Sequence, residues 1–126
     1  MLRAKDIMTK NVLSVRKDTN VVDVCKLLIK HRLSGLPVLD RKGRLVGFIS
    51  QRDIIAKVAL RDFLKKKAKD LMVKQVLYVF QDTLCDQISR IFTEKPYHYL
   101  PVIKAKKVIG IISRKDVIGR LLRQYY

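Results

Sequence analysis

Cysteine is scarce in this sequence, because Cys25 and Cys85 are the only two. No C-x-x-C pair and no cluster of histidines accompanies them. A disulfide framework needs several cysteines, and a structural zinc site needs closely spaced Cys and His ligands. We therefore expect neither kind of site, and we interpret both cysteines as small core or half-buried residues.

Long hydrophobic runs are also missing. No apolar stretch approaches the roughly 20 residues that span a bilayer, and the opening MLRAKDIMTK lacks the apolar segment of a secretory signal. We therefore expect a cytoplasmic protein that makes no membrane contact. Hydrophobic residues still make up 48% of the 126 residues, which is enough to build a folded core.

Acidic residues are few, since 11 Asp and Glu stand against 28 Lys and Arg, for a net charge of +17. A surface of this charge attracts polyanions such as nucleotides, nucleic acids or acidic protein faces. Charge alone does not distinguish specific binding from a solvated basic surface, and no zinc-finger or RNA-recognition signature is present. A basic nucleic-acid- or polyanion-binding protein is therefore the alternative hypothesis for function.

The sequence does contain an internal repeat. AKDIMTKNVLSV at 4–15 aligns with AKDLMVKQVLYV at 68–79, and LPVLD at 36–40 aligns with LPVIK at 100–104. GFISQRDII aligns with GIISRKDVI near the other end of the chain, after one residue is deleted in the intervening turn. Two copies of one unit fill nearly the whole chain. We therefore divide it into repeats at 1–64 and 65–126.

Each repeat shows the same predicted order: strand, helix, strand, strand, helix. In the first repeat the expected elements cover residues 12–15, 21–31, 36–39, 45–49 and 51 to about 64. Asp18, Thr19 and Asn20 offer N-cap groups for the first helix. The lysine-rich stretch 65–69 is expected to be a solvated connector. The predicted fold class is α+β, with two β-α-β-β-α repeats packed as a pseudo-twofold pair.

A serine and an aspartate three residues apart end the predicted hairpin in both repeats: Ser50 with Asp53, and Ser113 with Asp116. A carboxylate offers two acceptor oxygens, which suit the two neighbouring hydroxyls of a ribose. The serine hydroxyl and the free N–H groups of the following helix suit a phosphate. The same residues are also ordinary helix N-caps, and one copy alone leaves both interpretations open. The cations between serine and aspartate suit further phosphate charge; they are Arg52, Arg114 and Lys115.

The arrangement resembles the tandem cystathionine β-synthase (CBS) domain pair, also called the Bateman module. The resemblance rests on DIMT and DLMV, SGLPVLD and HYLPVIK, and GFISQRD and GIISRKD, in the same order in both repeats. It implies a regulatory module rather than an enzyme, binding an adenosine-containing ligand such as AMP, ADP, ATP or S-adenosylmethionine and requiring no metal or other cofactor. Family members commonly form dimers and regulate other proteins, so the expected partners are a second copy and an unidentified regulated protein.

By the same resemblance, each ligand site combines the approach to one LPV motif with the first strand of the other repeat. Site one comprises Ser34, Gly35, Leu36, Pro37, Ser50, Arg52, Asp53, Val76, Leu77 and Tyr78. Site two comprises Thr9, Asn11, Val12, Leu13, His98, Tyr99, Leu100, Pro101, Ser113, Arg114, Lys115 and Asp116. The leucine and proline side chains are expected to pack in the core while their backbone reads the base.

The two sites are expected to bind unequally. Gly35 in site one lets a ligand approach the backbone closely, whereas Tyr99 stands at the corresponding position of site two. We therefore expect site one to be the tighter of the two.

The closing helix of each repeat carries apolar residues that a dimer interface would use. An intramolecular core explains the same pattern equally well. The residues concerned are Ile54, Val58 and Phe63 in the first repeat and Val117, Leu121 and Leu122 in the second.

Overall fold

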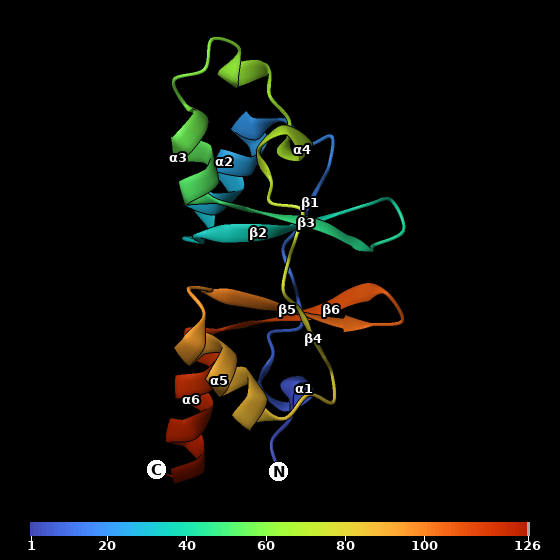
Figure 1. Ribbon diagram of the computed structural model, residues 1–126, viewed down its shortest axis with the longest axis vertical. Helices are drawn as coiled ribbons and strands as arrows, with labels where there is room; N and C mark the ends of the chain where they lie inside the picture. Colours follow the sequence, from blue (N-terminus) through green and yellow to red (C-terminus); the bar gives the residue numbers. More distant parts are fainter. Residues whose placement is uncertain (126) are drawn as a thin grey trace. The chain divides into compact units, whose positions relative to one another are not determined.

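The computed structural model describes residues 1–125, without the side chains of Leu121 and Tyr125, and divides the chain into two compact units (Figure 1). One unit is Leu13–Val76, here called the β1–β3 unit. The other, the β4–β6 unit, joins Met1–Val12 to the chain from Leu77 onward. Each contains one three-stranded sheet with helices, which confirms the α+β fold class and the two repeats. The pseudo-twofold packing stays a prediction.

In the β1–β3 unit the strand order is β1-β2-β3, with β1 parallel and β3 antiparallel to β2. The helices lie on one face of this sheet (Figure 1). The apolar face of α2 is buried against the sheet, with Val21, Val24 and Leu28 in the same core cluster as Val38 and Ile49. The elements are β1 (Val15–Arg16), α2 (Val21–Lys30), β2 (Gly35–Leu39), β3 (Leu45–Ser50), α3 (Gln51–Lys57), the 3-10 turn η1 (Phe63–Lys65) and α4 (Ala68–Leu71).

The β4–β6 unit repeats this topology, with strand order β4-β5-β6. Its core brings Ile88 and Phe92 of α5 against Leu100, Val102 and Ile112 of the sheet. Its elements are α1 (Ala4–Ile7), β4 (Val79–Phe80), α5 (Cys85–Glu94), β5 (Tyr99–Lys104), β6 (Lys107–Ser113) and α6 (Arg114–Tyr125).

The start of each helix shows which capping predictions were right. Asn20 is the N-cap of α2, and its side chain accepts a hydrogen bond from the amide of Val22 at 2.8 Å. The corresponding N-cap of α5 is Leu84, which makes no side-chain cap. Cys25 and Cys85 are both half-buried, as predicted, and burial raises the pKa of the Cys25 thiol.

Two predicted element boundaries were wrong. The first strand covers Val15–Arg16 rather than 12–15, because only these residues pair with β2. The second helix does not run to Leu64: α3 ends at Lys57, where its hydrogen bonds tighten into a 3-10 turn. Most helices in proteins depend on packing of an apolar face for their stability. Beyond the first turn of α3 that packing is weak, since the side chain of Ile55 is 68% exposed.

In the lysine-rich connector Lys65, Lys67 and Lys69 are exposed and Lys66 is half-buried, while hydrogen bonds hold the backbone in place. The carbonyl of Lys66 accepts from the amide of Val21 at 2.9 Å, and the amide of Ala68 donates to the carbonyl of Thr19 at 2.8 Å. Ala68 itself is fully buried and begins α4. The segment is therefore an integral part of the β1–β3 unit.

The compact units do not coincide with the sequence repeats, because the opening motif of each repeat packs on the other repeat's sheet. Thr9 pairs with Ile111 of β6, and Val73 pairs with Phe48 of β3. A Cβ added to Gly110 would lie 2.9 Å from Cγ of Met8 and closer still to its Sδ. The methionine of DIMT therefore explains the glycine of GIIS. In the same way, Met72 occupies the space beside Gly47.

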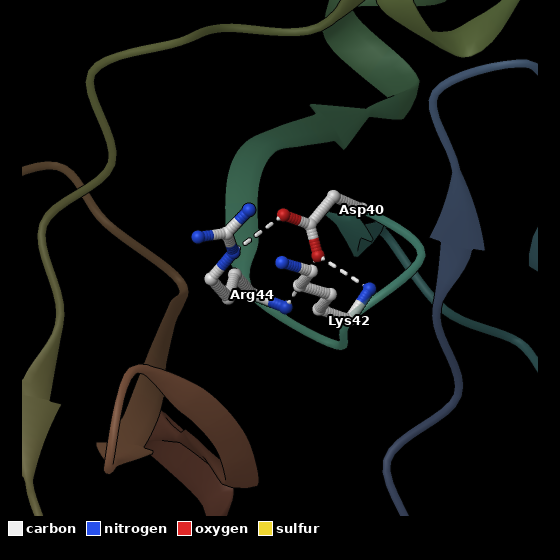
Figure 2. A network of polar contacts seen from close by, with 3 residues as sticks. All are labelled: Asp40, Lys42 and Arg44. Carbon is white, nitrogen blue, oxygen red and sulfur yellow. Dashed lines mark hydrogen bonds and ion pairs between the residues drawn. The ribbon is translucent and has the colours of Figure 1, made fainter.

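The β2–β3 hairpin is closed by one carboxylate (Figure 2). Oδ1 of Asp40 accepts from the backbone amides of Lys42 and Arg44, both at 2.9 Å, and Oδ2 accepts from Nε of Arg44 at 2.7 Å. These donors lower the pKa of Asp40 to about 2, with the backbone bond from Arg44 as the largest cause. Asp40 thus fixes the position of the basic loop that it begins.

Within residues 1–125, no helix is long and apolar enough to cross a membrane, and no group of three or more His, Cys, Asp or Glu is placed to hold a metal ion. Of the residues suggested for a dimer interface, Ile54 is buried in the core while Val58 and Leu122 are exposed. Phe63 and Val117 are half-buried, and the side chain of Leu121 lies outside the described residues. A dimer stays a prediction.

We expect Gly110→Ala to destabilise the β4–β6 unit by about 1–3 kcal/mol, because the added methyl group overlaps the Met8 side chain. Gly119→Ala is the matched control in the same unit, since nothing lies within 4 Å of its added Cβ and Ala favours a helix interior by about 1 kcal/mol. Urea unfolding measures both. Equal stabilities for Gly110→Ala and the wild type would show that Met8 does not enforce the glycine.

We expect the hairpin to lose the contribution of Asp40 only in acid. Because the pKa of Asp40 in the folded protein lies below its ordinary value of 3.8, that contribution is complete above pH 3.8 and is lost as the pH falls through about 2. NMR titration of the Lys42 and Arg44 amides measures the transition, which Asp40→Asn should abolish. A midpoint at the ordinary value would contradict the network.

Candidate functional site

The serine and aspartate of GFISQRD lie where β3 ends and α3 begins. The amide and the hydroxyl of Ser50 donate to Oδ2 of Asp53 at 2.9 and 2.8 Å, and the amide of Asp53 contacts the serine oxygen at 3.2 Å. This reciprocal pair is a capping box, so the N-cap interpretation is confirmed. It also holds the carboxylate in one orientation, with Oδ1 outside the cap.

The second copy repeats this geometry and adds one contact. The amide and hydroxyl of Ser113 donate to Oδ2 of Asp116 at 2.7 and 3.0 Å. The hydroxyl of Thr9 lies 3.4 Å from Oδ1 of Asp116, a long hydrogen bond. The structure therefore brings together residues 9, 113 and 116 of predicted site two. The position that corresponds to Thr9 in the other unit is Val73, which has no hydroxyl.

In both units, the strand beside the serine pairs with its parallel neighbour only near its far end, within the residues that the structure describes. β1 pairs with β2 only at Val38 and Leu39, so the half of that edge at Gly35–Pro37 lies beyond the described pairing. β4 likewise pairs with β5 only at Val102 and Ile103. On its other side, Gly35 is the direct partner of Ser50, and Tyr99 that of Ser113. In each unit, the described parallel pairing therefore stops short of the strand end that lies next to a capping box, and Gly35, Leu36 and Pro37 at the end of β2 are themselves buried.

The first helical residue ties each helix to the loop before LPV, a role that the sequence analysis missed. The side chain of Gln51 donates from Nε2 to the carbonyl of Leu33 at 3.0 Å. In the other unit, Arg114 donates to the carbonyls of Tyr97 at 2.9 Å and Lys95 at 3.3 Å, and its guanidinium lies 5.7 Å from the ring centre of Phe92. Part of the hydrogen-bonding capacity predicted for phosphate is thus used within the fold. The repeat alignment of these two positions was the available signal.

The remaining predicted residues divide clearly. Leu36, Pro37, Leu100 and Pro101 are fully buried, which confirms that their side chains belong to the core. Exposed residues include the cations suggested for phosphate and several others, namely Arg52, Lys115, Asn11 and His98. Ser34, Val12 and Val76 are half-buried, and Tyr78 makes an edge-to-face contact with Phe80. Leu77 and Tyr78 belong to the β4–β6 unit and Leu13 to the β1–β3 unit, so their place in the opposite unit's site stays a prediction.

The structure shows a steric reason for glycine at position 35, in addition to the close approach of a ligand expected from the sequence. A Cβ at this position would lie 2.5 Å from Cε1 of Phe48 on the neighbouring strand. In the other repeat the glycine is replaced by Tyr99 and the phenylalanine by Ile111. The aromatic ring is therefore carried by β3 in one unit and by β5 in the other, and each site has a differently shaped wall.

A family model described as the CBS domain matches residues 4–60 and again residues 68–123. The chain belongs to the CBS domain family. The resemblance inferred from the three repeated motifs is thereby confirmed, and each match contains one Ser–Asp capping box.

Two solved structures resemble this CBS-domain protein over its whole length. CBSX2, a CBS-pair protein of Arabidopsis thaliana, solved in complex with AMP, is 30% identical, with a TM-score of 0.92 and full coverage of both chains. The CBS domain pair of protein MJ0100, solved with 5′-methylthioadenosine and S-adenosyl-L-methionine, is 28% identical, with a TM-score of 0.84, and the match covers 100% of this chain and 99% of that one. Both similarities are to complete CBS pairs.

Inosine-5′-monophosphate dehydrogenase of Methanocaldococcus jannaschii is 30% identical over 94% of this chain. The match covers only 23% of that enzyme. The similarity is therefore to a minor part of the enzyme, and it transfers no catalytic activity to this chain.

We expect Gly35→Ala to destabilise the β1–β3 unit by about 1–3 kcal/mol, because its methyl group collides with the Phe48 ring. Adding Phe48→Ile, the residue type found in the other repeat, should recover part of that loss. A double-mutant cycle measured by urea unfolding should give a coupling of at least about 0.5 kcal/mol. Additive effects would mean that the ring does not determine the glycine.

Proposed function

We propose that this protein is a regulatory module that binds an adenosine-containing ligand, such as AMP, ADP, ATP or S-adenosylmethionine, at the Ser–Asp ends of its sheets. The observation that carries the proposal is the Asp53 carboxylate, fixed by Ser50 through Oδ2 beside the end of β2 that lies beyond the pairing with β1. The ligand complexes of the two similar CBS pairs support the same ligand class.

The ribose is the part of the ligand that this geometry suits best. Oδ1 of Asp53 lies outside the capping box and can accept from one ribose hydroxyl, while the remaining acceptor capacity of Oδ2 can take the other. A hydrogen bond to a charged acceptor is stronger than one between neutral groups. Because the cap already orients the carboxylate, little further ordering is needed when the ligand binds.

Groups next to Asp53 are proposed to bind the base and the phosphates of the ligand. The backbone at Gly35–Pro37, which lies beyond the pairing with β1, can form hydrogen bonds with the edge of an adenine, as strand edges do with a partner. Ser34 stands at the approach to this edge, where its carbonyl accepts from the amide of Gln51 at 2.8 Å. Arg52 is exposed one residue before the carboxylate and can follow a phosphate group into solvent.

The contacts support unequal binding by the two sites, with site one tighter. In site two the Thr9 hydroxyl already approaches Oδ1 of Asp116, so a ribose must compete with it. In site one Val73 offers no such donor, and Gly35 leaves the strand without a side chain beside Ser50. Tyr99 occupies the same strand position in site two.

Regulation requires more than binding. A ligand shifts an equilibrium only if it binds two arrangements of the protein unequally, and a regulated protein must respond to the difference between them. We propose that this CBS pair acts in that way on a protein partner. We also propose that it forms a dimer with a second copy of itself. The cytoplasmic location expected from the sequence stays a prediction.

We expect Asp53→Asn to weaken binding of the preferred ligand at least about 10-fold, because one carboxylate acceptor toward the ribose becomes an amide donor while an oxygen remains for the cap. Isothermal titration with AMP, ADP, ATP and S-adenosylmethionine measures the effect. Asp116→Asn should cause a smaller loss.

Asp23→Asn is the matched control, since Asp23 is an exposed acid in the first turn of α2 in the same unit. It removes the same charge and should leave affinity unchanged. Absence of binding by the wild type at millimolar ligand, or equal losses in Asp53→Asn and Asp23→Asn, would refute the proposed site.

A further inference from the structure

A hollow lies at the end of the β1–β3 sheet opposite the Ser50–Asp53 capping box. It has a volume of about 610 Å³ and is formed by the end of β1 and the residues after it, the β2–β3 hairpin and the start of α4. β2 begins at Gly35 beside the capping box and ends at Leu39 beside this hollow. The four residue steps between them span about 13 Å. The hollow is therefore separate from the proposed adenosine site.

The lining of this hollow is strongly basic. It contains six cations and two carboxylates, Asp18 and Asp40. Asp40 is engaged by its own hairpin, with Arg44 as its ionic partner at 2.7 Å, and Asp18 lies 3.8 Å from Lys69 in an exposed pair. In the described part of the chain the other four cations form no ion pair. They are Arg16, Lys17, Arg41 and Lys42.

These cations stand on backbone that hydrogen bonds hold in place. The amide of Arg16 donates to the Thr19 hydroxyl at 3.0 Å, and the amide of Lys69 donates to the carbonyl of Lys17 at 3.0 Å. On the facing segment, Asp40 closes the loop that carries Lys42 (Figure 2). Two rigid segments therefore present positive charge to one hollow, and their mutual repulsion is relieved when an anion enters.

The cluster is not a simple consequence of the repeat. At the positions of Arg16 and Lys17, the other repeat has Phe80 and Gln81. Its hairpin is nevertheless basic, with lysines at 104, 106 and 107. The strand-end cations therefore distinguish the β1–β3 unit, while basic hairpins are common to both units.

We propose that this hollow binds a small oligophosphate, a compact anion with two or more linked phosphate groups. The volume falls in the range of about 300–1,000 Å³ that small-molecule sites occupy. Arginine forks bind phosphate oxygens in pairs and lysines add point charges, and the hollow offers both from facing segments. None of the arginines and lysines that line the hollow belongs to the proposed adenosine site.

The test uses the full chain and inorganic triphosphate in 150 mM salt, a concentration that suppresses weak surface attraction. We expect saturable binding by isothermal titration, with NMR shift changes at the amides of 16–19 and 40–44. Arg16→Gln/Lys17→Gln should weaken binding at least 10-fold. The matched control is Lys104→Gln/Lys107→Gln, which removes the same charge from the other unit and should change affinity less than 2-fold.

Arg41→Gln/Lys42→Gln provides a second variant on exposed loop side chains, and urea unfolding checks that each variant is folded. A loss of at least 10-fold in this variant also supports the proposal. Absence of saturable binding, or equal losses in the two units, would refute it. Binding of a single-stranded oligonucleotide that depends on Arg16 and Lys17, without binding of triphosphate, would assign the hollow to nucleic acid and overturn the oligophosphate proposal.

Discussion

Each sheet of this protein depends on a strand partner that comes from the other sequence repeat. The amide and carbonyl of Thr9 pair with those of Ile111 at 2.9 and 3.0 Å, and Val73 pairs with Phe48 at 2.9 Å in both directions. These short bridges cover the outer edge of β6 and of β3, where unpaired backbone groups would otherwise invite aggregation. They also bring the methionine of each opening motif against a glycine of the hairpin. The two repeats are thus interdependent at the level of backbone hydrogen bonding.

The same exchange shapes the candidate site. Pairing of Thr9 with β6 places its hydroxyl beside Asp116, whereas the equivalent pairing in the other unit brings Val73. The Ser–Asp motif then serves two purposes that need not compete. Oδ2 accepts the capping bonds, and Oδ1 is outside them. A helix cap and a ribose acceptor can therefore be one group, because a carboxylate has more acceptor capacity than the cap uses.

Some differences between the repeats fall at positions that line the candidate site or the hollow. The first repeat has its aromatic ring at Phe48 on β3, and the second has it at Tyr99 on β5. The aligned buried positions Leu36 and Leu100 are both leucine. The cations at 16 and 17 have uncharged counterparts. Other buried positions change but stay apolar, as Val24 and Leu28 of α2 correspond to Ile88 and Phe92 of α5. Surface positions can diverge, so each unit can bind a different ligand on the same scaffold.

The repeat, the α+β class, most strands of the two hairpins, a cap within 18–20 and the Ser–Asp pairs could be predicted from the sequence, because each follows from local spacing and backbone preference. It could not determine that α3 ends at Lys57, since that depends on whether Ile55 finds a packing partner. It also could not show that Met8 packs on Gly110, that Phe48 enforces Gly35, or that Arg114 is tied to the Tyr97 carbonyl. These contacts join residues that are distant along the chain or lie on separate strands. They are visible only in the folded protein, because steric fit between side chains is set by the position of the whole backbone rather than by local sequence.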